Sequence, residues 1–224
     1  MVIQFAEATV DNPIFVEEAL AFYDDTFPLE VREPHEIFWE SLRYAKNNSA
    51  NNFHFLIGLE GEQIVSFATG HYIKEVNSGF IVYIAATPTK RSKGLGTKTL
   101  YKMEELLTED AKSAGFPSIQ SIVLETEKQE VVQTPEEKQD CIKRSRFFER
   151  NRYRKYEEID YYQPPLHDGG ERVPLNFYIK NYENQHLSKK EVSAIIRAIY
   201  KEKYYSVNGI DQRILMDCIS QMGV

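Results

Sequence analysis

A loop rich in glycine and basic residues interrupts the stretch IAATPTKRSKGLGTKTL, residues 84–100. The apolar run before the loop is typical of a strand, and the sequence after it is typical of a helix. A helix N-terminus offers unpaired N–H groups and the positive end of the helix dipole, so it suits a phosphate, and glycines let the backbone approach the anion. Four side chains add positive charge: Lys90, Arg91, Lys93 and Lys98. The alternative interpretation is a surface helix with a solvated basic face.

Three further side chains have the chemistry to move protons. Glu125 and Glu127 end the apolar stretch IVLETE, and a glutamate whose pKa is raised by burial can accept a proton directly or through water. The alternative for both is a strand end with two solvated carboxylates. His71 lies in the strand-like segment 63–76, and imidazole titrates near neutrality, although a strand histidine can equally be a packing residue.

Spacing excludes two familiar phosphate-binding loops. A P-loop requires Gly-x4-Gly-Lys-[Ser/Thr], but Thr97 separates Lys98 from Gly96. A dinucleotide-binding loop requires a third glycine where this chain has Thr99. A phosphate-containing ligand of this loop would therefore be bound through a different kind of motif.

Hydrophobic periodicity predicts the elements that position these residues. Helices are expected at 13–25, 35–48, 94–114 and 135–150, and strands at 3–8, 53–60, 63–76, 80–87, 119–126, 153–163 and 173–182. The strand–helix–strand order around residue 94 implies a parallel pair joined by a right-handed crossover. Both strands then end at the same sheet edge, where ligands usually bind in α/β sheets, so the basic loop and the LETE segment are expected to be neighbours.

The segment RSKGLG, residues 91–96, resembles the Arg/Gln-x-x-Gly-x-Gly/Ala acyl-CoA loop of the GNAT superfamily of N-acetyltransferases. The predicted order of elements is also similar to that family, and RFFERNRYRKY, residues 146–156, resembles its later segment x-Leu/Phe-Tyr-Glu-Lys-x-Gly-Phe. FYDDTFPLEVREP, residues 22–34, resembles a Phe-Pro-x-Glu-x-Arg loop of many bacterial members. The resemblance covers residues 1–182. It implies an α/β GNAT fold, whose mostly antiparallel sheet has a parallel strand pair around the acetyl-CoA site and helices on both faces.

The resemblance also implies the donor and its binding residues. Acetyl-CoA would be the co-substrate, with no metal, and its pyrophosphate would bind loop amides of Arg91, Ser92, Lys93, Gly94, Leu95, Gly96 and Thr97. The Leu95 side chain is expected to point into the core. The pantetheine arm would pair with the backbone of Ile84, Ala85 and Ala86. The Ala86 amide would polarise the thioester carbonyl.

The acceptor half is less defined. An amine of a small molecule or a peptide would attack the thioester directly, with Glu125 as the candidate base. Glu30 and Arg32 are placed where family members shape the acceptor pocket, and His71 and Glu127 are further candidates for contact with the substrate. The alternative for Glu30 and Arg32 is a local surface ion pair.

One departure from the family pattern concerns the general acid. Phe148 stands where the family often has a tyrosine, so it cannot donate a proton, although it can pack against the CoA arm. Arg152 replaces the usual glycine, and Cys141 replaces a frequent asparagine. Either the thiolate leaves unaided, or Tyr153 or another tyrosine serves, or catalysis is lost. The last case corresponds to a non-catalytic acyl-CoA sensor.

Composition limits the remaining partners and the location. The 224 residues carry a net charge of −7, which argues against charge-driven nucleic-acid binding. No apolar run reaches the roughly 18 residues that a membrane helix needs, and the N-terminus does not resemble a signal peptide. The two cysteines give neither a disulfide framework nor a metal-ligand spacing. We therefore expect a cytoplasmic protein without a membrane or nucleic-acid partner.

Residues 183–224 form a predicted C-terminal helical extension beyond the acetyltransferase-like domain, residues 1–182. Ser188 and Glu191 form a capping box for one helix, and Asp211 caps a second. Two amphipathic helices beyond a complete fold need a surface to cover. The extension is therefore either an arm for a homodimer or another partner, or a segment that packs on its own domain.

Overall fold

The computed structural model describes residues 3–27, 29–87, 94–167, 169–183 and 186–224. Its contacts divide the chain into two compact units, Met1–Ile119 and Gln120–Val224, and each unit is described by itself. Among these described residues, no helix is long and apolar enough to cross a membrane.

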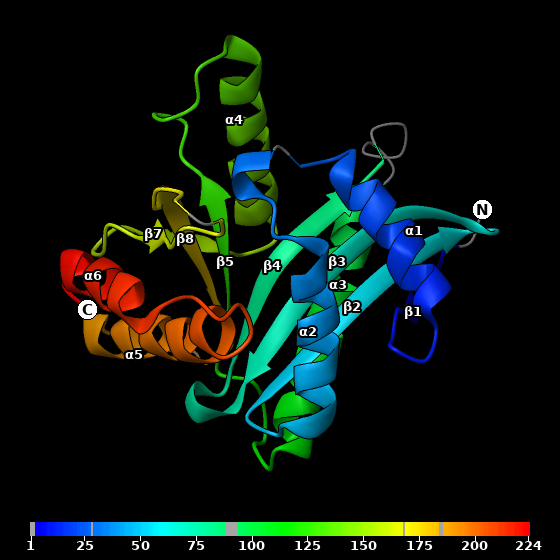
Figure 1. The fold of residues 1–224 in the computed structure, drawn as a ribbon, viewed down its shortest axis with the longest axis horizontal. Helices are drawn as coiled ribbons and strands as arrows, with labels where there is room; N and C mark the ends of the chain where they lie inside the picture. The colour runs from blue at the N-terminus through cyan, green and yellow to red at the C-terminus, as the bar shows by residue number, and fades with distance from the viewer. Residues whose placement is uncertain (1–2, 28, 88–93, 168, 184–185) are drawn as a thin grey trace. The chain divides into compact units, whose positions relative to one another are not determined.

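Unit 1 is an antiparallel sheet with helices on both faces (Figure 1). Its strands lie in the order β1-β2-β3-β4, and α1 and α2 cover one face while α3 covers the other. The bounds are β1 Gln4–Glu7, α1 Pro13–Asp24, α2 His35–Asn47, β2 Asn51–Glu60, β3 Gln63–Ile73, β4 Ser78–Ala86 and α3 Leu95–Ser113. Short 3-10 helices occupy Leu29–Val31 and Lys74–Val76.

Aromatic side chains fill the space between the sheet and α1–α2. Tyr23 of α1 packs edge-on against Phe38 of α2 and Tyr83 of β4, with ring centroids 4.9 Å apart in both pairs. Edge-to-face pairs add about 0.5–1.5 kcal/mol each beyond the area that they bury. The same rings hold the loop between α1 and α2, because the Tyr83 hydroxyl donates to the Val31 carbonyl at 2.8 Å and the Glu33 amide donates to the Tyr23 hydroxyl at 2.6 Å.

A buried histidine links three elements of unit 1. His54 of β2 lies between Glu7 of β1, 2.6 Å from Nδ1, and Asp110 of α3, 2.7 Å from Nε2. Burial alone would lower the pKa of His54, but hydrogen bonds and charge attraction from Asp110 and Glu7 outweigh it and raise the pKa to about 9. The imidazole is therefore positively charged at neutral pH and pairs with two carboxylates.

Unit 2 is built around β8, which pairs antiparallel with β5, β6 and β7. Its helical C-terminal segment follows β8 and packs on the same unit. The bounds are β5 Ser121–Glu127, α4 Pro135–Arg150, β6 Arg154–Tyr156, β7 Tyr162–Gln163, β8 Val173–Asn181, α5 Lys189–Ile199, a π-helix η4 Tyr200–Tyr205 and α6 Gln212–Met222.

The strand expected at 153–163 is divided into β6 and β7. Tyr156 pairs with Phe177 and Tyr162 pairs with Pro174. Between these two pairs the chain advances six residues on the β6–β7 side but only three residues along β8. The surplus residues leave the ladder, as in a large bulge, and such irregularities redirect side chains. Here they bring the Tyr161 ring to 4.8 Å from Phe177.

The first helix of the extension differs from the regular α-helix expected after Ser188. The capping box of Ser188 and Glu191 forms, but α5 ends at Ile199 and continues as a π-helix. A bond from the Ser206 amide to the Lys201 carbonyl, 3.0 Å long, spans the five residues that define this geometry. Short π-helical segments occur frequently at functional sites.

Helix α4 ends in a Schellman motif that requires a left-handed residue at Arg152. The Tyr153 amide donates to the Phe148 carbonyl and the Arg152 amide to the Glu149 carbonyl, both at 3.0 Å. The accompanying apolar contact is the edge-on pair of Phe148 and Tyr153, with centroids 5.8 Å apart. Arg152 has φ +70°, a conformation that favours glycine.

We expect Arg152→Gly to stabilise the protein by about 1 kcal/mol, because glycine removes the steric cost of the left-handed conformation. Urea unfolding measures the change. Arg150→Gly is the control, since Arg150 lies in the last turn of α4 and glycine there costs about 1 kcal/mol. Destabilisation by both variants would contradict this account of Arg152.

The raised pKa of His54 makes stability depend on pH in a defined window. The folded-state pKa of about 9 lies above the ordinary value of 6.5, so the stabilisation is complete below pH 6.5 and is lost as the pH rises toward 9. The full loss is on the order of 3 kcal/mol. Urea unfolding at pH 6 and pH 9.5 should show this loss for the wild type and little of it for His54→Gln. Equal pH dependence in the two proteins would refute the prediction.

Candidate active site

Helix α3 begins at a glycine that holds a left-handed backbone. Gly94 is the residue before the first turn, with φ +73°, and a Cβ added to it would meet no atom of the described residues within 4 Å. This left-handed conformation favours glycine over other residues. Leu95, next along the chain, is 3% exposed, so its side chain points into the core as predicted. Arg91, Ser92 and Lys93 of the predicted loop lie outside the described residues.

The first turn of α3 has the charge pattern of an anion site. It contains no acidic residue, and no side chain among the described residues caps its N-terminus. It carries instead the exposed Lys98, which the positive end of a helix dipole disfavours. By contrast, α4 and α5 begin with complete capping boxes. The amides of Leu95, Gly96 and Thr97 thus head a positive N-terminus, where a bound anion would satisfy them.

The end of β4 presents alternate backbone amides away from β3. The Thr87 amide donates to the Val65 carbonyl at 2.9 Å, so these two residues form a hydrogen-bonded pair. Bonded and non-bonded pairs alternate along antiparallel strands. The amides of Ile84 and Ala86 therefore point away from β3, and that of Ala85 points toward it. Of the three residues predicted to contact the pantetheine arm, Ile84 and Ala86 therefore have amides that do not bond to β3.

A hydroxyl pair fixes α3 to the same end of the sheet. The Thr99 hydroxyl donates to the Ser66 hydroxyl at 2.8 Å, and Ser66 lies opposite Ala86 in the β3–β4 register. Both Ser66 and Thr99 are completely buried. The end of β4 and the first turn of α3 are thereby held together within unit 1.

The carboxylate of Glu125, half-buried at the end of β5, accepts hydrogen bonds from side chains distant in the sequence. The Tyr161 hydroxyl donates to Oε1, and the Tyr204 hydroxyl lies 2.9 Å from Oε1 and 3.2 Å from Oε2. The Gln163 amide donates to Oε2 at 3.1 Å. Burial and the charge of Glu125 raise the pKa of Tyr161 well above its ordinary value, so this hydroxyl keeps its proton. Hydrogen bonds from such donors favour a charged carboxylate.

Glu127 has a different environment. It forms an ion pair with Arg144 of α4, and its backbone carbonyl accepts a hydrogen bond of 3.1 Å from the Asn176 side chain. The Glu127 side chain is 23% exposed. Glu125 and Glu127 are therefore neither equivalent nor simply solvated at the strand end.

Phe148 and Glu125 lie on opposite faces of the unit 2 strands. Phe148 is 3% exposed and packs on Tyr178 of β8, whereas Glu125 is paired with Phe177, and successive strand residues face opposite sides. Tyr153 is 1% exposed and lies beside Phe148, with the Lys180 ammonium 5.6 Å from its ring. Tyr153, the tyrosine that packs against Phe148, is thus part of the core.

The predicted substrate residues of unit 1 do not gather at one place. His71 is completely buried, 2.9 Å from the Asn51 side chain and with its ring 4.7 Å from Phe53. It lies five residues along β3 from Ser66, which corresponds to about 16 Å. Arg32 forms an ion pair of 2.8 Å with Asp24. The alternative interpretation of Arg32 as a member of a local surface ion pair therefore holds, with Asp24 as the partner. Glu30 lies in the Leu29–Val31 turn.

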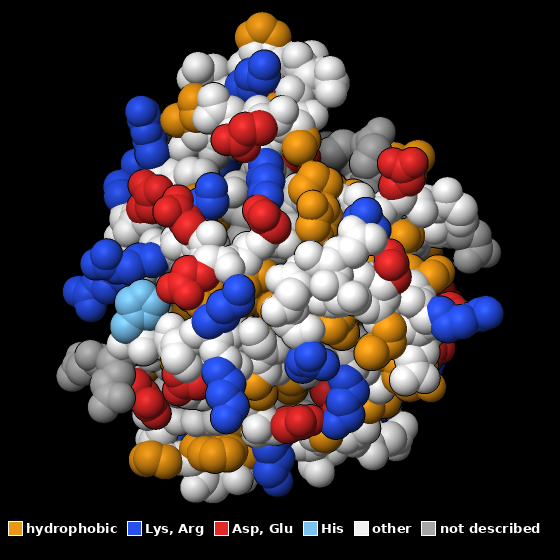
Figure 2. Space-filling model, turned by 90° about the vertical axis from the view of Figure 1, so that its left-hand side faces the viewer, with side chains coloured by type: hydrophobic (Ala, Val, Ile, Leu, Met, Phe, Trp, Pro, Cys, Tyr) orange, Lys and Arg blue, Asp and Glu red, His pale blue; other side chains and the backbone are white. Residues whose placement is uncertain are grey.

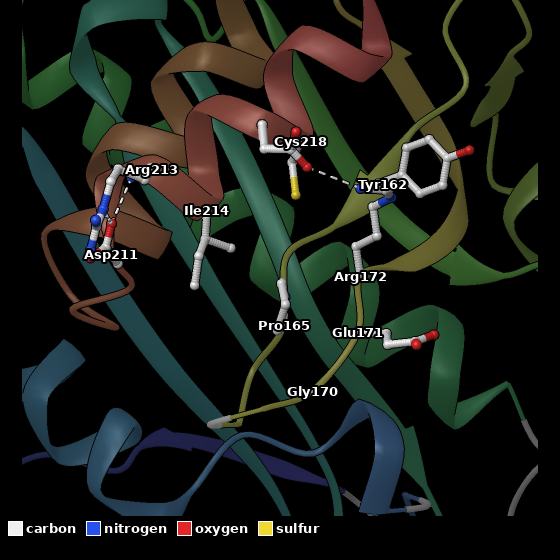
Figure 3. Close-up of a pocket in the computed structure, with 10 residues that line it drawn as sticks. Tyr162, Pro165, Gly170, Glu171, Arg172, Asp211, Arg213, Ile214 and Cys218 are labelled. Carbon is white, nitrogen blue, oxygen red and sulfur yellow. Dashed lines mark hydrogen bonds and ion pairs between the residues drawn. The ribbon is translucent and has the colours of Figure 1, made fainter.

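A cleft of about 820 Å³ lies between the β7–β8 loop and α6 (Figure 3). Arg172 crosses it, 5.3 Å above the Tyr162 ring and 3.1 Å from Asp217 of α6. Tyr161 and Gln163, on either side of Tyr162, turn toward Glu125, so β7 separates the cleft from that carboxylate. Charges of both signs line the cleft, and both signs are also interspersed on the face drawn in Figure 2.

Sequence reasoning did not identify the partners of Glu125. Tyr161 and Gln163 stand in the run YYQ, and Tyr204 lies in a helix 79 positions from Glu125. With 14 tyrosines in the chain, no spacing distinguishes these from tyrosines of the core. The one usable signal is the local cluster of tyrosines in YKEKYY, residues 200–205.

Comparisons with known proteins support the fold that the sequence predicted. The model of the acetyltransferase (GNAT) family matches residues 16–130. No curated protein sequence matches the chain. Many solved structures do, including a GNAT-family protein from Bacteroides thetaiotaomicron, which has a TM-score of 0.67 at 21% identity and covers 93% of this chain and 99% of its own. That share exceeds what residues 1–182 could supply, so part of the extension has a structural counterpart there.

Two other matched structures are enzymes with named acceptors. An aminoglycoside 6'-N-acetyltransferase in complex with coenzyme A has a TM-score of 0.54 at 15% identity, over 84% of this chain and 100% of its own. The ribosomal-protein-S18-alanine N-acetyltransferase of Escherichia coli has a TM-score of 0.51 at 12% identity, over 83% of this chain and 100% of its own. These similarities confirm the predicted α/β fold. Because the family model also spans more than half of the sequence, the chain belongs to the GNAT family of acetyltransferases.

Proposed function

We propose that the protein is an acetyl-CoA-dependent N-acetyltransferase whose acceptor is the primary amine of a small molecule or a peptide. The observation that carries the proposal is the N-terminus of α3. There the left-handed Gly94 leads into a first turn that has no carboxylate to balance the positive end of the helix dipole. Two matched structures, an aminoglycoside and a ribosomal-protein acetyltransferase, illustrate amine acceptors on this fold.

The donor half rests on the geometry of unit 1. No atom of the described residues lies within 4 Å of a Cβ added at Gly94, and the Cβ would stand at the helix N-terminus that a pyrophosphate would approach. The outward amides of Ile84 and Ala86 suit a pantetheine arm that pairs with β4 as an additional strand. The Ala86 amide is then the donor that we assign to the thioester carbonyl, whose oxygen gains negative charge during attack.

The acceptor half must remove a proton from the amine. A lysine-like amine has a pKa of about 10.4, so its deprotonation at pH 7 costs roughly 4.6 kcal/mol, whereas a thiol with a pKa near 8.5 leaves as thiolate for about 2 kcal/mol. A base is therefore needed more than an acid, which suits a chain with Phe148 in place of the usual tyrosine. We assign the base to Glu125, acting directly or through water.

We expect isothermal titration calorimetry to show binding of acetyl-CoA, weakened at least tenfold in Gly94→Val. The substitution places a branched side chain in the open space before α3 and strains the left-handed backbone. Gly115→Val is the matched control, because Gly115 at the other end of α3 also has a positive φ and no atom within 4 Å of an added Cβ.

Absence of binding by the wild type at millimolar acetyl-CoA would refute the proposed function. Equal weakening in both glycine variants would contradict the assigned site. Tight binding without acetyl transfer to any member of a panel of amines, polyamines, aminoglycosides and peptides would favour the sensor function that the buried Phe148 allows.

For Glu125→Gln we expect kcat to fall by a factor of about 10² or more, while the dissociation constant of acetyl-CoA changes little, because general bases contribute roughly 10²–10⁴. Steady-state kinetics with the best acceptor of the panel measures the change. Glu130→Gln is the control, since Glu130 is an exposed residue just beyond β5. Unchanged kcat in Glu125→Gln would remove Glu125 from the mechanism.

A further inference from the structure

The extension contributes a side chain to the surroundings of Glu125. Tyr204, from η4, is 1% exposed, and its hydroxyl lies within 3.2 Å of both carboxylate oxygens. It contacts both oxygens, whereas Tyr161 contacts Oε1 and Gln163 contacts Oε2. A donor that spans both oxygens restrains rotation of the carboxylate plane, and this restraint comes from residues beyond 182.

The backbone around Tyr204 is shaped to hold it in place. The Tyr204 ring packs edge-on against Tyr200, with centroids 5.3 Å apart, and the Tyr200 hydroxyl donates to the Tyr162 carbonyl of β7. The Tyr204 carbonyl accepts a 3.0 Å bond from the Ile210 amide. Tyr204 is therefore fixed on both sides, by β7 through Tyr200 and by the turn that leads to α6.

Three parts of unit 2 place side chains near Glu125. The β6–β7 segment presents Tyr161 and Gln163, and β8 presents Phe177 directly opposite. The extension presents Tyr200 and Tyr204. Burial, with Cys218 and Glu125 nearby, raises the pKa of Tyr200 above its ordinary value. The hydroxyls of Tyr161 and Tyr204 and the amide of Gln163 thus place neutral donors against this carboxylate.

We propose that Tyr204 is a positioning residue for Glu125, so that the C-terminal extension forms part of the acceptor half of the active site. The inference rests on the proposed function, in which Glu125 accepts the proton of the amine. By donating to the charged carboxylate, Tyr204 both orients Glu125 and keeps it ionised at neutral pH.

The test compares Tyr204→Phe with Tyr205→Phe. Both variants lose one hydroxyl from η4, but Tyr205 is 50% exposed, whereas Tyr204 is 1% exposed and its hydroxyl contacts Glu125. The phenylalanine at 204 keeps the ring that packs on Tyr200, so the fold is expected to persist. Thermal unfolding and acetyl-CoA calorimetry verify this for each variant.

The first measurement follows the side-chain carboxyl carbon of Glu125 by NMR across the acidic pH range, with Glu125→Gln to assign the signal. We expect the titration midpoint to rise by about half to one pH unit in Tyr204→Phe, because a hydrogen bond to the charged form is lost, and to stay in place in Tyr205→Phe. Equal midpoints in Tyr204→Phe and the wild type would overturn the inference. This measurement needs no turnover, so it decides the inference even if the proposed function fails.

The second measurement is the pH profile of kcat/KM. In Tyr204→Phe the acidic limb should move to higher pH by the same amount as the NMR midpoint, while acetyl-CoA affinity is unchanged. A uniform loss of activity at every pH, with no shift of the limb, would mean that Tyr204 acts only through stability. Absence of turnover in the wild type would instead count against the proposed function alone.

Discussion

The hydrogen bonds to the carboxylate of Glu125 connect segments that are distant in sequence. One side chain of β5 accepts bonds from Tyr161 and Gln163 on either side of Tyr162, and from Tyr204 in the extension. A half-buried charge with fewer donors would be costly, so each partner depends on the presence of the others. The irregular strand between β6 and β7 and the π-helix both serve this arrangement, because each departs from regular geometry where it delivers a hydroxyl to Glu125.

The donor side of the proposed site depends on backbone groups rather than on side chains. Its elements are a left-handed glycine, the first turn of α3 and the outward amides of β4. Such a site tolerates wide change in side chains, provided that the conformation persists. The proposed acceptor side, in contrast, depends on particular hydroxyl and carboxylate groups. The sequence resemblance to the family differs in the same way, since it is close in residues 91–96 and departs from the family pattern at Phe148.

The elements of unit 1, and the glycine directly before α3, could be predicted from the sequence because their signals are local. Periodicity, the proline at the start of α1 and the glycine spacing each act over a few residues. The division of the strand at 153–163 could not be predicted, since its cause is the pairing of Tyr156 and Tyr162 with β8. The role of Tyr204 was hidden for the same reason: contacts across 79 positions leave no periodic trace in one sequence.

The surplus residues between β6 and β7 also affect how this chain is aligned with its relatives. An aligner that matches β6 to an unbroken strand would place a three-residue gap between Tyr156 and Tyr162 and treat it as a tolerated surface insertion. In the structure this insertion lies against the interior of unit 2, because Ile159 and Tyr161 are both buried. The length of the insertion, rather than its composition, sets where the Tyr161 hydroxyl lies. Shortening it by one residue would alter the phase of the chain and turn Tyr161 away from Glu125.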